Sequence, residues 1–256
     1  MKNLFFEEPE IPELKEEHTL VDMHYHTEYS ADCSTKLQEV LKFAAKLEIG
    51  VAITDHNSVK GNLIAQKQRK VMVIPAVEVT TKNDKDLLIY FNNKSDMISF
   101  NEKVIENHIR KHTKFRFNKL NLPTENILEL ARDYNALVSI AHPFTVFPKK
   151  SFYYFNREKN NYLMEMIDAI ESINAIRNRK ENLASYGWAL SEGKGFTAGS
   201  DGHRLNWLGK ALTCCKAESV EEFLDSIKKK KNILIGKEMK FPSKLITELT
   251  ILKNRV

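Results

Sequence analysis

Short apolar runs that alternate with amphipathic, helix-like segments constrain the fold of this chain more than any other feature. Residues 19–23, 51–54 and 137–141 are apolar runs of strand length, and apolar residues recur at helical spacing between 37 and 47. Strands that alternate with helices are typical of βα units and a parallel sheet. About seven such units follow one another, and seven or eight close most naturally into a barrel. The sequence therefore predicts an α/β barrel.

The remaining elements follow from the same patterns. Further apolar runs predict strands, and capping residues with helical periodicity predict helices. The predicted strands are 71–77, 86–91, 168–173, 196–199 and 233–235, and the predicted helices are 62–69, 123–134, 182–191 and 219–229.

The chain of 256 residues suits one large α/β barrel or two small domains. No linker rich in Gly, Pro or Ser divides it, so we expect an irregular acidic arm over 1–18 and a single domain over 19–256. A basic insertion at 92–121 carries Phe100, Phe115 and Phe117, and we expect it to be mostly helical. Residues 144–166 are aromatic and basic, which indicates a loop or lid.

Composition excludes several classes of protein. No apolar run approaches the roughly 20 residues of a membrane span, and the acidic N-terminus is no signal peptide, so we expect a cytoplasmic protein. Cys33, Cys214 and Cys215 are too few for a disulfide framework, and the adjacent pair is expected to be buried. The net charge of +5 suits an anionic substrate but is too small to imply nucleic acid binding by itself.

His24 and His26 directly follow the first predicted strand. Residues two apart on an extended chain point to the same side, so both imidazoles can bind one metal ion. An ordinary pair of hydrogen-bonding histidines is the alternative. Other histidines and carboxylates lie close to further strand ends; the candidate ligands are His24, His26, Asp32, His56, Glu78, His142, Asp201 and His203.

The carboxyl ends of parallel strands meet on one face of a barrel, so these residues are expected to meet in one pocket. Each motif alone has an ordinary alternative, such as a turn, an ion pair or a core histidine. Histidine together with carboxylate favours Zn²⁺, Mn²⁺ or Fe²⁺ over Ca²⁺ or Mg²⁺. The set is too large for one tetrahedral ion, so we expect two or three divalent ions, with Glu78 as a bridge.

The order of the motifs resembles the PHP (polymerase and histidinol phosphatase) superfamily. His-x-His is followed by Ser-x-Asp, Thr-Asp-His, Val-Glu-Val, Ala-His-Pro and Gly-Ser-Asp-Gly-His, over nearly the whole of residues 19–236. The resemblance implies a distorted, TIM-like (β/α)7 barrel of PHP type, a trinuclear metal site and phosphoesterase activity.

The resemblance also implies a role for each ligand. His24, His26, Glu78 and Asp201 would hold the first metal; Glu78 and His142 the second; Asp32, His56 and His203 the third.

Two positions depart from the family pattern. The family often has a further histidine on the second metal, where this chain has Asp86. Either Asp86 substitutes for it, or His108 or His112 reaches the site. Asp32 stands where some members carry histidine, and this exchange can shift metal preference.

The leading functional interpretation is hydrolysis of a phosphomonoester of a small metabolite or nucleotide by a metal-activated water. Asp55 would orient a ligand histidine from outside the metal shell, and Arg177, Arg204 or Lys149 would hold phosphate, unless they form surface ion pairs. One alternative is a phosphodiesterase or exonuclease that binds short oligonucleotides along 92–121. Another is a non-catalytic, metal-stabilised module that serves a partner protein. The substrate, the metal, the partner and the oligomeric state stay open.

Overall fold

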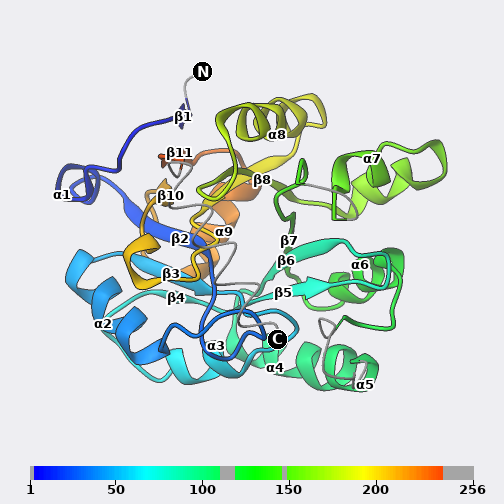
Figure 1. Ribbon diagram of the computed structural model, residues 1–256, viewed down its shortest axis with the longest axis horizontal. Helices are drawn as coiled ribbons and strands as arrows, with labels where there is room; N and C mark the ends of the chain where they lie inside the picture. Colours follow the sequence, from blue (N-terminus) through cyan, green and yellow to red (C-terminus); the bar gives the residue numbers. More distant parts are fainter. Residues whose placement is uncertain (1–2, 110–118, 146–148, 239–256) are drawn as a thin grey trace.

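A computed structural model describes residues 3–109, 119–145 and 149–238 (Figure 1). Its strands form two sheets in the middle of the molecule, with helices on the outside. The first sheet has the spatial order β1 (Leu4–Phe5), β11 (Ile233–Gly236), β10 (Ala211–Cys215), β2 (Thr19–Tyr25), β3 (Gly50–Ile53) and β4 (Val73–Ile74). The second has the order β5 (Ala76–Thr80), β6 (Asp86–Tyr90), β7 (Leu137–Ile140), β8 (Ala169–Asn174) and β9 (Gly195–Gly199).

The α/β class predicted from the sequence is confirmed, but the sheets are not purely parallel. β2, β3 and β4 are parallel, as are β7, β8 and β9. β6 runs antiparallel to both β5 and β7. The connection from β5 to β6 is a tight turn, in which the amide of Thr81 donates to the carbonyl of Lys85 over 2.9 Å. A turn this short can join only antiparallel strands.

Single bridges, rather than a continuous ladder, connect the two sheets. Tyr25 bridges to Gly202, and His56 bridges to Glu78, each in parallel sense. Both bridges lie at carboxyl ends of strands. β9 approaches β2 so closely that a Cβ on Gly199 would lie 2.4 Å from the Cβ of His24. Only glycine permits this approach, which brings residues 199–203 onto His24 and His26.

The space between the sheets is filled by a small apolar cluster. Met23, Ala52, Ala76 and Leu88 belong to it and are fully buried. Helix α9 (Val220–Lys228) adds Phe223, Leu224 and Ile227 to this cluster, next to the amino end of β9. The opposite, carboxyl end of the interior is therefore left for polar side chains.

The helices α2 (Leu37–Leu47), α3 (Lys60–Ala65), α6 (Thr124–Arg132), α8 (Arg179–Ser191) and α9 lie within a few residues of their predicted positions. The run 71–77, predicted as one strand, divides at Pro75 into β4 and β5, which belong to different sheets. Proline lacks the amide that a continuing ladder needs. Cys214 and Cys215 are buried as predicted, within strand β10, which the sequence analysis did not predict.

The N-terminal arm and the loop at 144–166 contain more structure than expected, whereas the described helices of the basic insertion agree with its helical prediction. The arm over 1–18 includes β1 and the short helix α1 (Ile11–Leu14). The basic insertion contains α4 (Lys94–Phe100), a π-helical stretch (Asn101–Ile105) and α5 (Glu106–His108). The loop at 144–166 contains α7 (Ser151–Phe155) and a 3-10 helix (Glu158–Met166).

Phe100 does not serve the insertion as an exposed aromatic contact. It is fully buried, with its ring 5.4 Å from the rings of Phe91 and of Tyr134. Phe115, Phe117 and His112 lie outside the described residues. Among the described helices, none combines the length and the apolar character needed to cross a membrane.

Candidate metal centre

The first cluster consists of His24, His26, Glu78 and Asp201. The Nε2 atoms of the two histidines lie 3.1 Å apart, and Glu78 Oε2 lies 3.2 Å from one and 3.3 Å from the other. Asp201 Oδ1 lies 3.5 Å from His24 Nε2 and 3.3 Å from His26 Nε2. Ligand atoms of a tetrahedral ion with bonds of about 2.0–2.1 Å lie about 3.3–3.4 Å apart. The two histidines therefore lie at the spacing of tetrahedral ligands from each other and from each carboxylate, and ligand atoms of His24, His26 and Glu78 all lie within 4.8 Å of one another.

The orientation of the His24 ring is set by Glu171, a residue that the sequence analysis missed. His24 Nδ1 lies 2.8 Å from Glu171 Oε1. This contact places the ring proton on Nδ1 and leaves the Nε2 lone pair for the cluster. The other carboxylate oxygen of Glu171 accepts from the amide of His142 over 2.7 Å and from Asn174 Nδ2 over 3.0 Å. One buried carboxylate thus orients groups at the ends of two strands, β2 and β7.

The third cluster consists of Asp32, His56 and His203. Asp32 Oδ2 lies 3.5 Å from His56 Nε2 and 3.4 Å from His203 Nε2. His203 Nδ1 is 2.9 Å from the carbonyl of Asp201, and His56 Nδ1 is 3.3 Å from the hydroxyl of Thr80. Both rings therefore turn Nε2 toward Asp32, as metal-binding histidines held by an outer acceptor do.

The second cluster consists of Glu78, Asp86 and His142. His142 Nε2 lies 3.3 Å from Glu78 Oε1 and 3.8 Å from Asp86 Oδ2. Asp86 Oδ1 accepts from the Thr80 hydroxyl over 2.8 Å, and Asp86 Oδ2 accepts from Lys149 Nζ over 2.6 Å. This cluster differs from the other two because a protein cation already contacts one of its carboxylates.

Buried polar atoms without hydrogen-bond partners test whether the residues fit metal ions. Among the described residues, Glu78 Oε1 and His203 Nε2 are buried and have no hydrogen-bond partner. Unsatisfied buried polar atoms are costly, and native proteins retain them mainly where an ion, a water or a substrate completes the bonding. Both atoms point at neighbouring ligand atoms of their clusters, so the donor set fits divalent cations.

The electrostatics of the clusters also favour cations. Burial alone would lower the pKa of His26, but Asp201 and Glu78 raise it to about 10. Burial likewise opposes charge on Glu78 and Asp201, yet the neighbouring histidines hold the pKa of both carboxyls well below their usual range. Without a metal ion, the carboxylates are therefore balanced by ring protons, which a bound metal would displace.

Two of the cluster residues have left-handed backbone conformations. His142 has φ 26° and Asp201 has φ 51°. Such values are uncommon for residues other than glycine and are retained where the surroundings enforce them. Glu171 holds the amide of His142, and the amide of Asp201 donates to the carbonyl of His24 over 2.8 Å. Both residues are thus held in place at the strand ends.

Asp55 and Arg177 have contacts other than those expected. Asp55 accepts from the amide and the hydroxyl of Thr27, over 2.6 and 2.8 Å, so it fixes the turn directly after His26 rather than an imidazole ring. Burial raises the pKa of Asp55 to about 6. Arg177 Nη1 donates to the Thr145 hydroxyl over 2.9 Å.

Arg204 and His108, the remaining candidates, are placed as follows. Arg204 is half-buried directly after His203, and its carbonyl accepts from the Tyr25 hydroxyl over 2.8 Å. His108 Nδ1 lies 2.8 Å from the carbonyl of Val104 in its own helix. His108 belongs to none of the groups of close ligand atoms found among the described residues.

Asn174 and Asp22 are further residues that the sequence analysis missed. Asn174 Nδ2 donates to Asp201 Oδ2 over 3.1 Å. Asp22 accepts from the amide and hydroxyl of Ser200 and from the amide of Gly209, which fastens the segment before Asp201 to β2. A carboxylate inside an otherwise apolar strand is the only sequence signal for Asp22 and Glu171. It indicates burial but not the partner.

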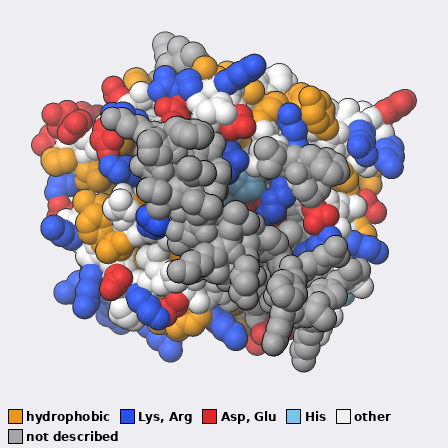
Figure 2. All heavy atoms as spheres, viewed as in Figure 1, with side chains coloured by type: hydrophobic (Ala, Val, Ile, Leu, Met, Phe, Trp, Pro, Cys, Tyr) orange, Lys and Arg blue, Asp and Glu red, His pale blue; other side chains and the backbone are white. Residues whose placement is uncertain are grey.

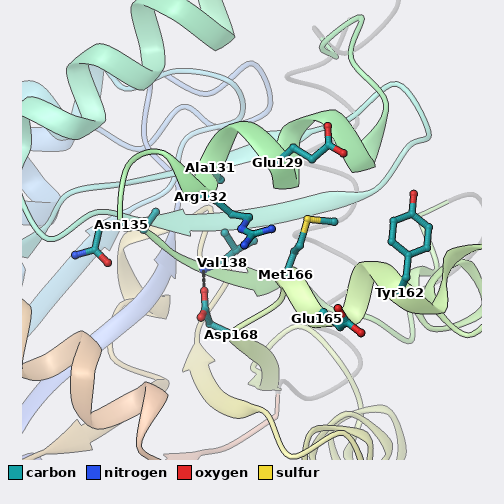
Figure 3. Close-up of a pocket in the computed structure, with 10 residues that line it drawn as sticks. Glu129, Ala131, Arg132, Asn135, Val138, Tyr162, Glu165, Met166 and Asp168 are labelled. Atoms are coloured by element: carbon teal, nitrogen blue, oxygen red, sulfur yellow. Dashed lines mark hydrogen bonds between the residues drawn. The ribbon is translucent and has the colours of Figure 1, made fainter.

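Two of the clefts in the described structure differ in their position relative to the clusters. One, of about 780 Å³, is lined by Lys85, Thr145 and Lys150 together with aromatic residues, and its lining residues are sequence neighbours of Asp86, His142 and Lys149. Figure 2 shows a histidine surface near the middle of one face, with lysine and arginine side chains beside it. The other cleft lies at the amino ends of β7 and β8, where Asp168 accepts from the amide of Val138 over 2.9 Å (Figure 3). It is at the opposite end of the strands from the three clusters.

Comparisons with known proteins identify the family and the fold of the chain. The family model of the PHP domain matches residues 22–254. PsfC from Pseudomonas syringae is 12% identical, with a TM-score of 0.63 over 93% of this chain and 98% of that one. A two-domain Bacteroides vulgatus protein containing a predicted PHP-like metal-dependent phosphoesterase is 12% identical, with a TM-score of 0.64 over 98% of this chain and 73% of that one.

A structure of Endonuclease Q with a 27-mer duplex that carries an abasic lesion at the active site is 22% identical, with a TM-score of 0.65. The match covers 86% of this chain and 60% of the endonuclease, so this chain corresponds to only part of that protein. A search of curated proteins gave no match. At these identities the structural likeness supports the fold alone.

Proposed function

The chain belongs to the PHP domain family, and on this premise we propose that it is a metal-dependent phosphoesterase. The proposed reaction is hydrolysis of a phosphomonoester of a small metabolite or nucleotide. The observation that carries the proposal is the spacing of the first cluster, in which the Nε2 atoms of His24 and His26 lie 3.1 Å apart and each lies 3.2–3.5 Å from an oxygen of Glu78 and of Asp201. Such spacing in a buried group of histidines and carboxylates has no evident structural purpose without a cation.

In this proposal the first and third clusters each hold one divalent metal ion. One ion would lie in the first cluster, held by His24, His26, Glu78 and Asp201. The other ion would lie in the third cluster, held by Asp32, His56 and His203. Zn²⁺, Mn²⁺ and Fe²⁺ are the ions that suit these donors. When bound, the ions would make a water molecule nucleophilic near neutral pH and offset the charge of the phosphoryl group.

The protein's own residues would position this chemistry. Glu171 fixes the proton of His24 on Nδ1 and holds the strained backbone of His142. Burial lowers the pKa of Lys149, but the opposing effect of Asp86 and Glu78 is larger and raises it above its usual value. Lys149 would therefore be a cation at the mouth of the centre, where its charge would attract a phosphoryl oxygen.

The direct test combines metal analysis with hydrolysis of p-nitrophenyl phosphate. We expect more than one transition-metal ion per chain and complete loss of turnover on chelation. His26→Ala should lower turnover at least about 10²-fold, because it removes a proposed ligand of the first ion. His108→Ala is the matched control, since that ring bonds to its own helix. A metal-free protein with full turnover would overturn the proposal.

A phosphodiester substrate, such as a short oligonucleotide, is a second candidate. It is favoured by the cleft beside the second cluster, where Lys150 Nζ lies 4.6 Å from the centre of the Tyr153 ring and Tyr153 is 60% exposed. Exposed aromatic rings with nearby cations suit stacked bases and a phosphate backbone. Faster hydrolysis of bis-(p-nitrophenyl) phosphate than of the monoester, and loss of oligonucleotide cleavage in Tyr153→Ala, would select this candidate.

A further inference from the structure

The second cluster differs from the others in its charge arrangement. In each cluster a histidine nitrogen lies 3.2–3.5 Å from a carboxylate oxygen, and at the second cluster these atoms are His142 Nε2 and Glu78 Oε1, at 3.3 Å. At the second cluster, Lys149 Nζ lies only 2.6 Å from Asp86 Oδ2, the oxygen that faces His142 Nε2. The Asp86 side chain is fully buried and that of Lys149 is 26% exposed. The pair is therefore a close, mostly buried ion pair inside the ligand set.

The residues directly after Lys149 pack against the residues directly after His142. The amide of Phe152 donates to the carbonyl of Pro143 over 3.0 Å, and its ring stacks on Phe144 with a centroid distance of 4.6 Å. The hydroxyl of Ser151 donates to the carbonyl of Lys149 over 3.2 Å. These contacts join the start of α7 to the residues directly after His142. They therefore hold Lys149 where its ammonium group contacts Asp86.

A divalent ion on Asp86 would be close to this ammonium group. With a bond of about 2.1 Å to Oδ2, the ion could lie no more than about 4.7 Å from Lys149 Nζ. Two cations at that distance in a buried site repel each other strongly. The other oxygen of Asp86 accepts from the Thr80 hydroxyl over 2.8 Å, so both oxygens of the carboxylate already accept from protein donors.

We propose that Lys149 takes the place of the metal ion at the second cluster, so that the centre holds two divalent ions and one tethered ammonium group. The proposal rests on the proposed function. Asp86, in place of the family's histidine, supplies the negative charge that an ammonium group requires and a neutral imidazole would not. Lys149 then offers N–H donors to a phosphoryl oxygen next to Glu78 and His142, as a fixed positive charge that does not exchange.

The test is the number of metal ions bound per chain, measured by elemental analysis after reconstitution with excess Mn²⁺ and gel filtration. Wild-type protein should bind about two ions, and Lys149→Met should bind about three, because the freed Asp86 can join Glu78 and His142 as ligands. Lys149→Arg keeps the charge and should stay at about two. Lys150→Met removes the neighbouring ammonium group, which lies over Tyr153, and should also stay at about two.

The outcomes separate this inference from the proposed function. Three ions in the wild-type protein, or an unchanged count in Lys149→Met, would overturn the assignment of Lys149 while leaving the phosphoesterase proposal intact. No bound ion in a folded wild-type protein would overturn both. Circular dichroism checks folding, and Lys149→Gln provides the same test if the methionine variant does not fold.

Discussion

Glu171→Gln tests whether one buried carboxylate organises the metal centre from outside it. In the structure two oxygens of Glu171 accept from three donors: His24 Nδ1, the amide of His142 and Asn174 Nδ2. A glutamine has the same shape but only one acceptor oxygen, so its NH₂ group must face either His24 or His142. Either arrangement leaves a buried donor without an acceptor.

The size of the effect follows from this count. Loss of an outer partner of a metal-binding histidine costs about 10–100-fold in metal affinity, equivalent to about 1.4–2.8 kcal/mol. The unsatisfied donor should also lower the free energy of unfolding by about 1–3 kcal/mol. Both effects should appear together, and substrate KM should change less than turnover.

The assay is a metal titration, by calorimetry or by competition with a chromophoric chelator, together with a thermal melt. Asp168→Asn is the matched control, because Asp168 lies just before the same strand and accepts from the amide of Val138 at the opposite end. Both variants should lose stability, but only Glu171→Gln should lose metal affinity. A metal dissociation constant for Glu171→Gln within about twofold of the wild-type value would refute the reasoning.

Three further predictions follow from the same geometry. Asp201→Asn should lower turnover at least about 10²-fold and weaken metal binding without a large change in melting temperature, because it keeps the shape but removes a ligand charge. The measurements are turnover per folded molecule and bound metal, and normal values for both would contradict the prediction. Gly199→Ala should abolish folding or metal binding, since its Cβ would lie 2.4 Å from that of His24. Gly187 in helix α8 has open space around it, so Gly187→Ala should instead raise the free energy of unfolding by up to about 1 kcal/mol, measured by denaturant titration. Metal affinity should fall as pH is lowered, because the pKa of His26 is about 10 in the metal-free protein and an ion must displace its proton. Calorimetry in buffers of different ionisation enthalpy should show proton release, and identical heats of binding in all buffers would refute the prediction.

The arrangement of strands was only partly predictable from the sequence. Local apolar patterns located β2, β3, β6, β7, β8 and β9, because a buried strand is a property of a few consecutive residues. The direction of β6 against its neighbours was not predictable from those patterns, since an apolar run is the same in either sense. The split at Pro75 and the pairing of β10 with β2 depended likewise on contacts between distant segments.

The candidate ligands could be located from the sequence because each lies close to a strand end, where a parallel arrangement brings side chains together. The structure places His24, His26, Glu78 and Asp201 within one group for that reason. Their orientation was decided only by the tertiary structure. Glu171 on β8 holds His24 on β2 across 147 residues of sequence, and Lys149 reaches Asp86 across 63. No local pattern encodes such partners, because a hydrogen bond depends on the distance between atoms in the folded chain and not on their separation along it.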